Sequence, residues 1–414
     1  GVVVVTGTNG KTTTSKMIEE ILTEEGYAVI HNSAGSNLSR GIASTLVKHV
    51  NFFGTRIDAD VAVFEIDEAT MPEATTKLRP EVVLVTNLFR DQLDRYGELD
   101  KTAEIIGNSL RGLVTARVLL NGDDPLVSSL KRYVEGEVIF FGINDKNLKA
   151  IGNSAMDSKD CLNCGHELLY DNRYLGHLGD WKCPNCGEKR ENLKYFVSDV
   201  DLKPNFSTFV LNSGKEDLKI KMPMPGLYNI YNGLAAAAAS LVLGIASPAI
   251  SHSLHNCEAA FGRMEIIDVN NKRAMLLLVK NPTGASQALS AIFSDGRPKK
   301  IGLFLNDNFA DGTDVSWIWD VDFETFNLKE STFVVSGIRA EDMALRLKYA
   351  GIEGDKIIIN KNLVESVTVL TSLLDRDEMA YILPTYTAMI EIRGNFASKN
   401  DDLCNMGKIT KRGI

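Results

Sequence analysis

The stretch VVVVTGTNGKTTT, which runs from Val2 to Thr14, limits the possible folds of this chain more than any other feature. Its valine run predicts a strand that is buried on both faces, as in a mostly parallel sheet. Gly7 and Gly10 then favour a tight turn, and Thr12–Glu25 has the pattern of a helix. A strand, a glycine turn and a helix in this order are typical of a loop whose backbone N–H groups hold phosphate.

The second half of the stretch, TGTNGKT, matches the end of the Walker pattern at Gly10, Lys11 and Thr12. In that pattern Lys11 would reach the β- and γ-phosphates of ATP, and Thr12 would hold Mg²⁺. The standard pattern has glycine where Val5 stands, and Gly7 supplies the flexibility instead. The residues predicted to bind the nucleotide are Gly7, Thr8, Asn9, Gly10, Lys11, Thr12 and Thr13. The alternative is a glycine turn with an incidental lysine.

Acidic residues follow the next apolar strand, in the sequence VAVFEIDEAT. Glu65 stands at the carboxyl end of this strand, and ligands of open parallel sheets gather at that end. Glu65 is therefore the best candidate for a protein carboxylate that helps Thr12 to hold Mg²⁺. For Asp67 and Glu68, helix capping or solvation is the favoured interpretation, with metal or substrate contact as the alternative.

Short apolar runs alternate with helical patterns over residues 1 to about 150, which predicts a mostly parallel α/β sheet. The predicted strands after the first are Ala59–Glu65, Glu81–Thr86, Arg117–Asn121 and Val138–Phe141. Residues of about 157–195 break this alternation. Beyond them Tyr195–Val210 and Leu218–Met222 are predicted to be antiparallel strands. The alanine-rich Tyr228–Gly244 is predicted to be a helix that packs tightly on the sheet.

A second alternation begins near Ala274 and predicts a second doubly wound α/β unit. Its predicted strands are Met275–Val279, Lys300–Leu305, Thr332–Gly337, Lys356–Asn360 and Ala380–Pro384. Its predicted helices are Ala285–Ser294, Ala340–Ala350, Leu363–Leu374 and Tyr386–Phe396. The join is expected within Phe261–Asn270. We therefore expect an ATP-binding domain of residues 1–262 and a Rossmann-like C-terminal domain of residues 263–414.

Four of the six cysteines form two CxxC pairs within the interrupted region. The pairs, Cys161 with Cys164 and Cys183 with Cys186, have the spacing of a zinc ribbon inserted at about 157–195. Four thiolates complete a tetrahedron, so Zn²⁺ here would be structural. The alternative is a redox or disulfide pair. Two nearby histidines, His166 and His177, are not expected to be ligands because four cysteines suffice.

Composition excludes some classes of protein. The formal net charge of −9 argues against a nucleic-acid-binding protein, which usually carries a basic excess. No apolar run approaches the roughly 18 residues of a membrane span. Paired cysteines without a disulfide scaffold favour a reducing, cytoplasmic compartment. The chain opens on Gly1 rather than Met. A native N-terminal segment is therefore expected to be missing from this sequence.

Several motifs together resemble those of Mur ligases and folylpolyglutamate synthases. They are TGTNGKT, TNLFRDQLDRYG (86–97), LNGDDP (120–125), PGLYNIYNGLAA (225–236) and FGRME (261–265), in the order of that family. The resemblance covers nearly the whole chain and implies a Mur ligase-like P-loop domain with a Rossmann-like C-terminal domain. It also implies that Asn229 or Asn232 contacts adenine, and it places Arg263 at the interdomain hinge, among the cofactor-binding residues.

Departures from the general Mur pattern resemble the MurT family of Gram-positive bacteria. Gln92 replaces a histidine, Ile106 stands in the register of a carbamylated lysine, and LLVKNP (277–282) replaces the Asp-Tyr-Ala-His motif. The resemblance implies a subunit of lipid II isoglutaminyl synthase that uses ATP and Mg²⁺. It would amidate the α-carboxyl of D-glutamate in the lipid II stem peptide, at the inner face of the membrane. Ammonia would come from a glutaminase partner, GatD, in a heterodimer.

One acidic loop is implicated in that partnership. In NDNFADGTDVSW (306–317) the resemblance implies that one aspartate completes the Cys–His pair of the partner. Asp314 is favoured, Asp311 is second and Asp307 is third. The alternative is an acidic, turn-forming surface loop. Asn87 and Asp91 shape either the substrate side or only a structural loop, and His31–Gly41 is either a lipid II contact or a simple connection.

Two rival functions remain open from sequence. One is a Mur-fold ligase that adds an amino acid, as folylpolyglutamate synthase does, and the replaced Asp-Tyr-Ala-His motif argues against it. The other is a non-catalytic nucleotide-binding scaffold with a zinc ribbon, against which Lys11 and Glu65 argue. Turnover with glutamine, with a free amino acid or with neither would separate the three.

Overall fold

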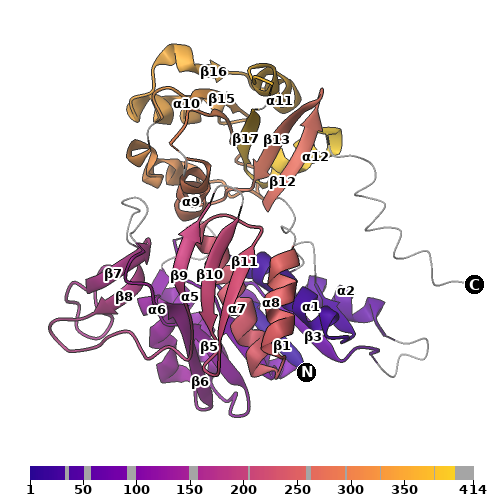
Figure 1. Cartoon of the computed structure of the whole chain (residues 1–414), viewed down its shortest axis with the longest axis vertical. Helices are drawn as coiled ribbons and strands as arrows, with labels where there is room; N and C mark the ends of the chain where they lie inside the picture. The colour runs from indigo at the N-terminus through magenta and orange to yellow at the C-terminus, as the bar shows by residue number, and fades with distance from the viewer. Residues whose placement is uncertain are drawn as a thin grey trace, which may run out of the picture. The chain divides into compact units, whose positions relative to one another are not determined.

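The computed structural model describes most of the chain as two compact units, residues 1–260 and 261–414 (Figure 1). Residues outside the description are 33–36, 51–56, 91–98, 149–156, 204–205, 258–262, 294–295, 327, 377 and 397–414. Asp91, Gln92 and part of the His31–Gly41 segment therefore lie outside it.

The first unit is built on one mixed sheet, with β1 near its middle. Among the described residues its strand order is β11-β10-β9-β6-β5-β4-β1-β3-β2. Strands β1 to β6 are parallel to their neighbours, and β9 pairs in parallel with β6. The pairs β9–β10 and β10–β11 are antiparallel. Their bounds are β1 Val2–Thr6, β2 Val29–His31, β3 Val61–Glu65, β4 Val82–Val85, β5 Arg117–Asn121, β6 Glu137–Ile143, β9 Tyr195–Leu202, β10 Ser207–Asn212 and β11 Asp217–Met222.

Strand β1 explains the placement of the glycine turn. Val3, Val4 and Val5 have no exposed surface, because helices cover both faces of the sheet around them. β1 lies between β3 and β4, and Val5 is opposite Glu65 on one side and Leu84 on the other. Parallel pairing in this register brings the carboxyl ends of three strands together at one edge, where the glycine turn begins.

Helices α1 (Lys11–Glu24) and α7 (Leu227–Val242) pack against each other on one face of the sheet. The five alanines Ala235–Ala239 of α7 are buried, and small side chains permit this close approach. Other helices of the unit are α2 (Ser39–Lys48), α3 (Met71–Leu78), α5 (Leu99–Leu110), α6 (Pro125–Ser129) and α8 (Ser247–Asn256). The predicted strand Tyr195–Val210 is in fact two strands, β9 and β10, because the chain reverses between them.

The cysteine region forms a small insertion between β6 and β9. Its β7 (Leu169–Leu175) and β8 (Leu178–Lys182) pair as an antiparallel hairpin with Gly176 and His177 at the turn. The two CxxC pairs flank this hairpin, one before β7 and one directly after β8. The cysteines thus lie at the base of the hairpin, and its tip can contact the rest of the unit.

The second unit has one sheet in the order β12-β13-β17-β14-β15-β16 among the described residues. All neighbours are parallel except β12 and β13. The strands are β12 Arg263–Val269, β13 Lys272–Leu277, β14 Lys300–Phe304, β15 Thr332–Ser336, β16 Ile357–Ile359 and β17 Met379–Pro384. The helices α9 Pro282–Ile292, α10 Ala340–Tyr349, α11 Leu363–Ser372 and α12 Tyr386–Phe396 accompany them, with apolar clusters on both faces of the sheet.

The predicted join at Phe261–Asn270 contains strand β12, which the sequence analysis missed. Asn270 and Asn271 both have positive φ, 51° and 63°, and they form the tight turn between β12 and β13. Asparagine tolerates this left-handed conformation, so the Asn-Asn pair is a hairpin signal.

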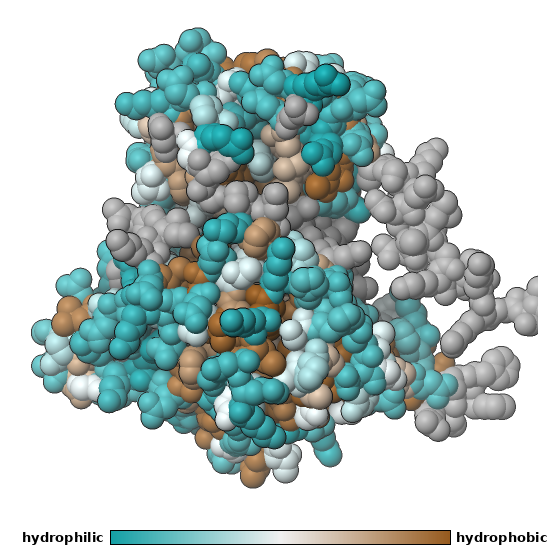
Figure 2. Space-filling model, viewed as in Figure 1, coloured by the Kyte–Doolittle hydropathy of each residue, from teal (hydrophilic) through white to brown (hydrophobic). Residues whose placement is uncertain are grey.

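The surface shown in Figure 2 is largely hydrophilic, with apolar residues in small groups between polar ones. Among the helices that the structure describes, none has the length and apolar content needed to cross a bilayer.

Candidate active site

The glycine turn between β1 and α1 has the backbone geometry of a phosphate-binding loop. Gly7 and Gly10 have φ values of 122° and 87°, which side chains rarely adopt. A Cβ at Gly7 would overlap Thr86 Oγ1, and a Cβ at Gly10 would overlap Asn232 Oδ1. Gly10 is the N-cap residue of α1, and no side chain among the described residues caps the start of this helix. Its first N–H groups are therefore available to an anion.

Lys11 lies inside this loop. Its Nζ donates to the Gly7 carbonyl at 2.5 Å and to Glu68 Oε1 at 2.8 Å, and the Lys11 and Glu68 side chains are both buried. Burial alone would lower the pKa of Lys11, but the carboxylates of Glu68 and Glu65 outweigh it and raise that pKa. The site therefore holds a charged ammonium where the pattern predicts the phosphate-binding lysine.

The acidic residues after β3 have different environments. Asp67 accepts a hydrogen bond from Ala69 N at 3.2 Å and caps a short 3₁₀ helix, as favoured from the sequence. For Glu68 that interpretation was wrong, because it is buried against Lys11 rather than solvated. The ion pair joins residues 57 positions apart, and no local pattern identifies it.

Glu65 has the environment that a metal ligand needs. It is 4% exposed, and its Oε2 has no hydrogen-bond partner among the described residues. Asn32 fixes the Glu65 backbone, donating to its carbonyl at 2.8 Å and accepting from its N–H at 2.8 Å. A buried carboxylate oxygen without a donor is costly unless a cation satisfies it. The environment of Glu65 thus fits a ligand of Mg²⁺.

The segment after β4 supports the loop from the side. Asn87 Oδ1 accepts from Asn9 N at 2.9 Å, Asn87 Nδ2 donates to Asn9 O at 3.0 Å, and Thr86 Oγ1 donates to the same carbonyl at 2.8 Å. Thr8 and Phe89 exchange two further hydrogen bonds, of 3.1 and 3.0 Å. Asn87 therefore holds the phosphate loop in place. This is the structural role of the two predicted for it, the other being a contact on the substrate side.

The start of α7 reaches the same loop. Asn232 Oδ1 lies against Gly10 and is 3.5 Å from Thr14 Oγ1, and both Asn229 and Asn232 are buried. Asn229 Nδ2 donates to the Pro225 carbonyl at 2.8 Å. The structure thus brings both candidate adenine contacts near the loop. Arg263 lies in β12, and its side chain is outside the described part of the chain.

The four cysteines form a compact cluster. Their Sγ atoms lie within 4.8 Å of one another, with Cys161 close to Cys186 and Cys164 close to Cys183. Gly165 and Gly187 follow the second cysteine of each pair with φ values of 71° and 78°, which shape two equivalent turns.

The thiols of this cluster are suited to a cation. Hydrogen bonds from the Asn185 side chain and the His166 backbone lower the pKa of Cys164 to about 6. Burial raises the pKa of Cys161 to about 12. Four thiolates this close together would repel one another, and a tetrahedral cation removes that repulsion. The cluster fits a closed structural metal site. Neither His166, which is exposed, nor His177 belongs to it.

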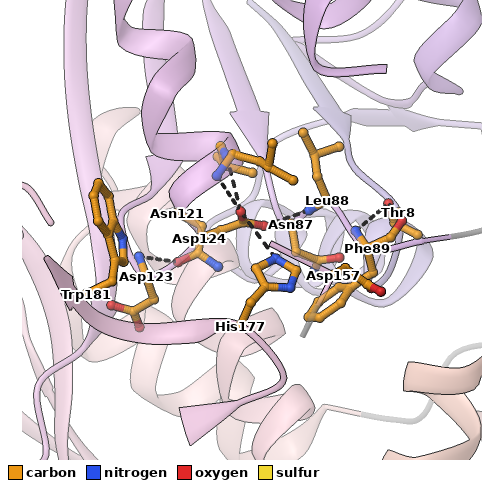
Figure 3. A network of polar contacts seen from close by, with 12 residues as sticks. Thr8, Asn87, Leu88, Phe89, Asn121, Asp123, Asp124, Asp157, His177 and Trp181 are labelled. Atoms are coloured by element: carbon orange, nitrogen blue, oxygen red, sulfur yellow. Dashed lines mark hydrogen bonds and ion pairs between the residues drawn. The ribbon is translucent and has the colours of Figure 1, made fainter. Parts of the chain in front are cut away.

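Buried polar groups attach this ribbon to the turn after β5 (Figure 3). Asp123 accepts from Arg190 Nη1 at 2.8 Å, Tyr231 Oη at 2.8 Å and Ile143 N at 2.7 Å. Trp181 Nε1 donates to the Gly122 carbonyl at 3.0 Å. The LNGDDP motif therefore serves as the anchor of the ribbon, a role that the sequence analysis did not assign.

In the second unit the three aspartates of the acidic loop differ in their contacts. Asp311 is buried and accepts from Thr387 N at 2.7 Å and from Thr387 Oγ1 at 2.5 Å, at the start of α12. Asp307 pairs with Arg339 at 2.8 Å. Asp314 is half-buried, and its Oδ1 accepts from Ser316 N at 2.8 Å. Asp311 and Asp307 thus have clear structural partners elsewhere in the unit.

Comparison with known proteins adds family information. The chain matches the Mur ligase middle domain over residues 5–167 and the MurT ligase C-terminal domain over residues 278–389. It is similar to a Streptococcus pneumoniae (strain R6) protein named "Lipid II isoglutaminyl synthase (glutamine-hydrolyzing) subunit MurT", with 37% identity over 96% of this chain and 87% of that protein. The protein of the same name from Staphylococcus aureus (strain COL) is 35% identical over 94% and 85%.

Solved structures agree on the fold. A pseudomurein peptide ligase type C from Methanothermus fervidus has a TM-score of 0.74 and 24% identity, covering 95% of this chain and 77% of its own. A MurF structure from Acinetobacter baumannii has a TM-score of 0.67 and 17% identity, covering 95% and 76%. At these identities the likeness concerns the fold alone.

Proposed function

Because the chain belongs to the MurT family of lipid II isoglutaminyl synthase subunits, we propose that it uses ATP to amidate lipid II during peptidoglycan synthesis. The group amidated would be the α-carboxyl of D-glutamate in the stem peptide, which becomes D-isoglutamine. The observation that carries this proposal is the family similarity along 96% of the chain, together with a phosphate loop that contains a buried, charged Lys11. The lipid-linked substrate favours action at the inner face of the membrane.

Two displacements account for the reaction. A carboxylate oxygen attacks the γ-phosphorus of ATP and ADP leaves, which gives an acyl phosphate. Ammonia then attacks the acyl carbon, phosphate leaves, and the nitrogen loses a proton. Neither step requires a nucleophile from the protein, so its residues act by position and charge.

The residues of the first unit would divide this work. Lys11 and the backbone N–H groups of Gly10–Thr13 would neutralise and orient the phosphates, because the N–H groups of Thr8 and Asn9 already donate to Asn87. Thr12 and Glu65 would hold Mg²⁺, which would neutralise phosphate charge when bound. Asn229 or Asn232 would contact adenine, and Arg263 would act at the hinge.

The ribbon cysteines would hold Zn²⁺ as a structural ion. The fit of four thiols within 4.8 Å supports a metal, and the sulfur ligand set favours zinc. Zinc would fix the base of the β7–β8 hairpin and would not take part in the chemistry.

Ammonia would come from a GatD-like glutaminase subunit. Of the three aspartates in the acidic loop we propose Asp314 as the one that orients the partner's catalytic histidine. This assignment is supported by the contacts of the other two aspartates: Asp311 accepts twice from Thr387, and Asp307 pairs with Arg339. Asp314 has one local backbone contact through Oδ1.

The test is an amidation assay with ATP, Mg²⁺ and a lipid II-type substrate, with and without the glutaminase subunit. We expect ammonium to support the reaction with this chain alone and glutamine to support it only with the partner. Mass spectrometry detects the replacement of one hydroxyl by an amino group. ATP hydrolysis that depends on a free amino acid, with no amidation, would favour an amino-acid ligase instead. Absence of any turnover would favour a non-catalytic scaffold.

A further inference from the structure

A four-residue segment, Asn87–Arg90, lies between the phosphate loop and the ribbon insertion (Figure 3). Asn87 and Phe89 face the loop. Asn87 exchanges two side-chain hydrogen bonds with the backbone of Asn9, and the Phe89 backbone exchanges two with the hydroxyl of Thr8. Any shift of this segment would therefore move the backbone of both loop residues.

The other two residues of the segment, Leu88 and Arg90, make hydrogen bonds on the side away from the loop. Leu88 N donates to Asp124 Oδ2 at 2.7 Å, and Arg90 N donates to Asp157 Oδ2 at 2.9 Å. Asp124 also caps α6 through Leu126 N, so its position is fixed. Asp157 lies at the entrance of the cysteine region, four positions before Cys161. The segment is thus hydrogen-bonded to the loop on one side and to the ribbon and its anchor on the other.

The tip of the ribbon hairpin contacts the same place. His177 is completely buried, and its ring lies 4.5 Å from the ring of Phe89. Its Nε2 is 3.4 Å from Asp124 Oδ1, and neither ring nitrogen has a hydrogen-bond partner among the described residues. A buried imidazole in such a position does not gain stability from hydrogen bonding. Its ring therefore contacts Phe89 itself and Asp124, the residue that accepts from Leu88 N.

The four cysteines lie at the base of the hairpin whose tip is His177. β7 begins after Cys164, β8 ends beside Cys183, and His177 is at the turn between them. The Tyr170 hydroxyl holds the carbonyl of His177 at 2.9 Å within the hairpin. Closure of the four thiolates around a cation would fix the base of the hairpin, and the short paired strands would carry that constraint to its tip.

We propose that His177 and Asp157 are positioning residues for the phosphate loop, and that they couple metal binding by the four cysteines to nucleotide binding. The proposal rests on the nucleotide and zinc sites of the proposed function but goes beyond them. Coupling of this kind is reciprocal, so zinc and Mg²⁺·ADP raise the affinity for each other by the same factor. We expect a factor of about five or more, the lower end of typical coupling between sites.

The experiment measures both affinities on the full chain. Zinc affinity is determined by competition with a zinc-selective chromophoric chelator, with and without saturating Mg²⁺·ADP. ADP affinity is determined by calorimetry on zinc-loaded and zinc-depleted protein. Asp157→Ala should reduce the coupling factor to about two or less, whereas Asp157→Asn, which retains an acceptor for Arg90 N, should restore it. His177→Ala should act like Asp157→Ala.

The matched control is Lys131→Met. Lys131 forms ion pairs with Glu188 and Glu191 of the ribbon, at 2.7 and 2.6 Å, and makes no hydrogen bond or ion pair with the described residues 88–90. Its loss weakens attachment of the ribbon but should leave the coupling factor unchanged. Independent zinc and ADP affinities in the unaltered chain would overturn this inference while leaving the proposed function intact. An unchanged coupling factor in both Asp157→Ala and His177→Ala would show that these two residues do not couple the metal site to the phosphate loop. Failure of the zinc-loaded chain to bind ADP would overturn both proposals.

Discussion

Lys11 donates a 2.8 Å hydrogen bond to Glu68, and both side chains are buried beneath the glycine turn. An isolated buried charge costs several kcal/mol, so each of these charges depends on the other. The pair keeps the ammonium of Lys11 charged within the loop that is proposed to bind phosphate.

Substitution of Glu68 by glutamine should destabilise the first unit. We expect Glu68→Gln to lower its free energy of unfolding by about 3 to 5 kcal/mol at neutral pH, because the Lys11 charge loses its carboxylate partner. Urea unfolding followed by circular dichroism measures the change. Glu73→Gln is the control, since Glu73 pairs with Lys77 at the surface, where an ion pair contributes about 1 kcal/mol or less. Equal effects of the two substitutions would contradict the importance of the buried pair.

The same pair predicts an alkaline pH dependence. Burial alone lowers the pKa of Lys11, but Glu68 and Glu65 raise it above the ordinary value of 10.5, so the folded state holds this proton more tightly than the unfolded state. Its stabilising contribution is fully present below pH 10.5 and is lost as the pH rises through the folded-state pKa. The difference in unfolding free energy between the unaltered chain and a Lys11→Met/Glu68→Gln double variant, which leaves neither member of the pair charged alone, should therefore be constant at neutral pH and change only above about pH 10. A difference that already varies between pH 6 and about pH 8 would point to another titrating group.

Removal of the ribbon metal should destabilise the first unit. We expect one zinc ion per chain by elemental analysis, and its loss after Cys164→Ser or after chelation, because the four thiols form one cluster. Thermal unfolding should then begin at a lower temperature. Cys257→Ser is the control, because Cys257 is buried in the apolar core away from the cluster. Full zinc retention by Cys164→Ser would show that the cluster is not the metal site.

Local patterns predicted much of the first unit. The valine run and the two glycines place β1, the turn and α1 to within a residue of the structure, since strand burial and positive φ leave a direct mark on the sequence. The position of Glu65 followed from the rule that parallel strands present ligands at their carboxyl ends. Cysteine spacing likewise identified the cluster.

Other features depend on residues that are distant in the sequence. The Lys11–Glu68 pair and the bonds of Asn87 to Asn9 each join separate βα connections, and no spacing rule indicates them. His177 lies outside the cysteine cluster, and its burial against Phe89 follows only from folding of the hairpin onto the sheet. Strand β12 was missed because its alternation is weak and the Asn-Asn turn signal went unused.

Glu65 is predicted to determine the Mg²⁺ requirement. Glu65→Gln keeps the size of the side chain but removes the charge from its unsatisfied oxygen. We expect the Mg²⁺ concentration for half-maximal ATP turnover to rise at least about ten-fold, as for substitutions that disturb a metal site. ADP binding without Mg²⁺ should be little changed. Glu81→Gln, at an exposed pair with Arg117, should leave both measurements as they are. An unchanged Mg²⁺ dependence in Glu65→Gln would exclude Glu65 as a ligand.

Substitutions of Asp314 and of Asp311 should have different effects on amidation with glutamine and with ammonium. Asp314→Asn should reduce glutamine-dependent amidation by about 10³- to 10⁴-fold, as when a triad aspartate is replaced by asparagine, and should leave ammonium-dependent amidation intact. Asp311→Asn should instead lower stability, because Asp311 accepts from both Thr387 N and Thr387 Oγ1. Assays with glutamine and with ammonium, each with the partner subunit present, make the comparison. If Asp311→Asn folds normally and alone loses the glutamine reaction, then Asp311 rather than Asp314 completes the partner's triad.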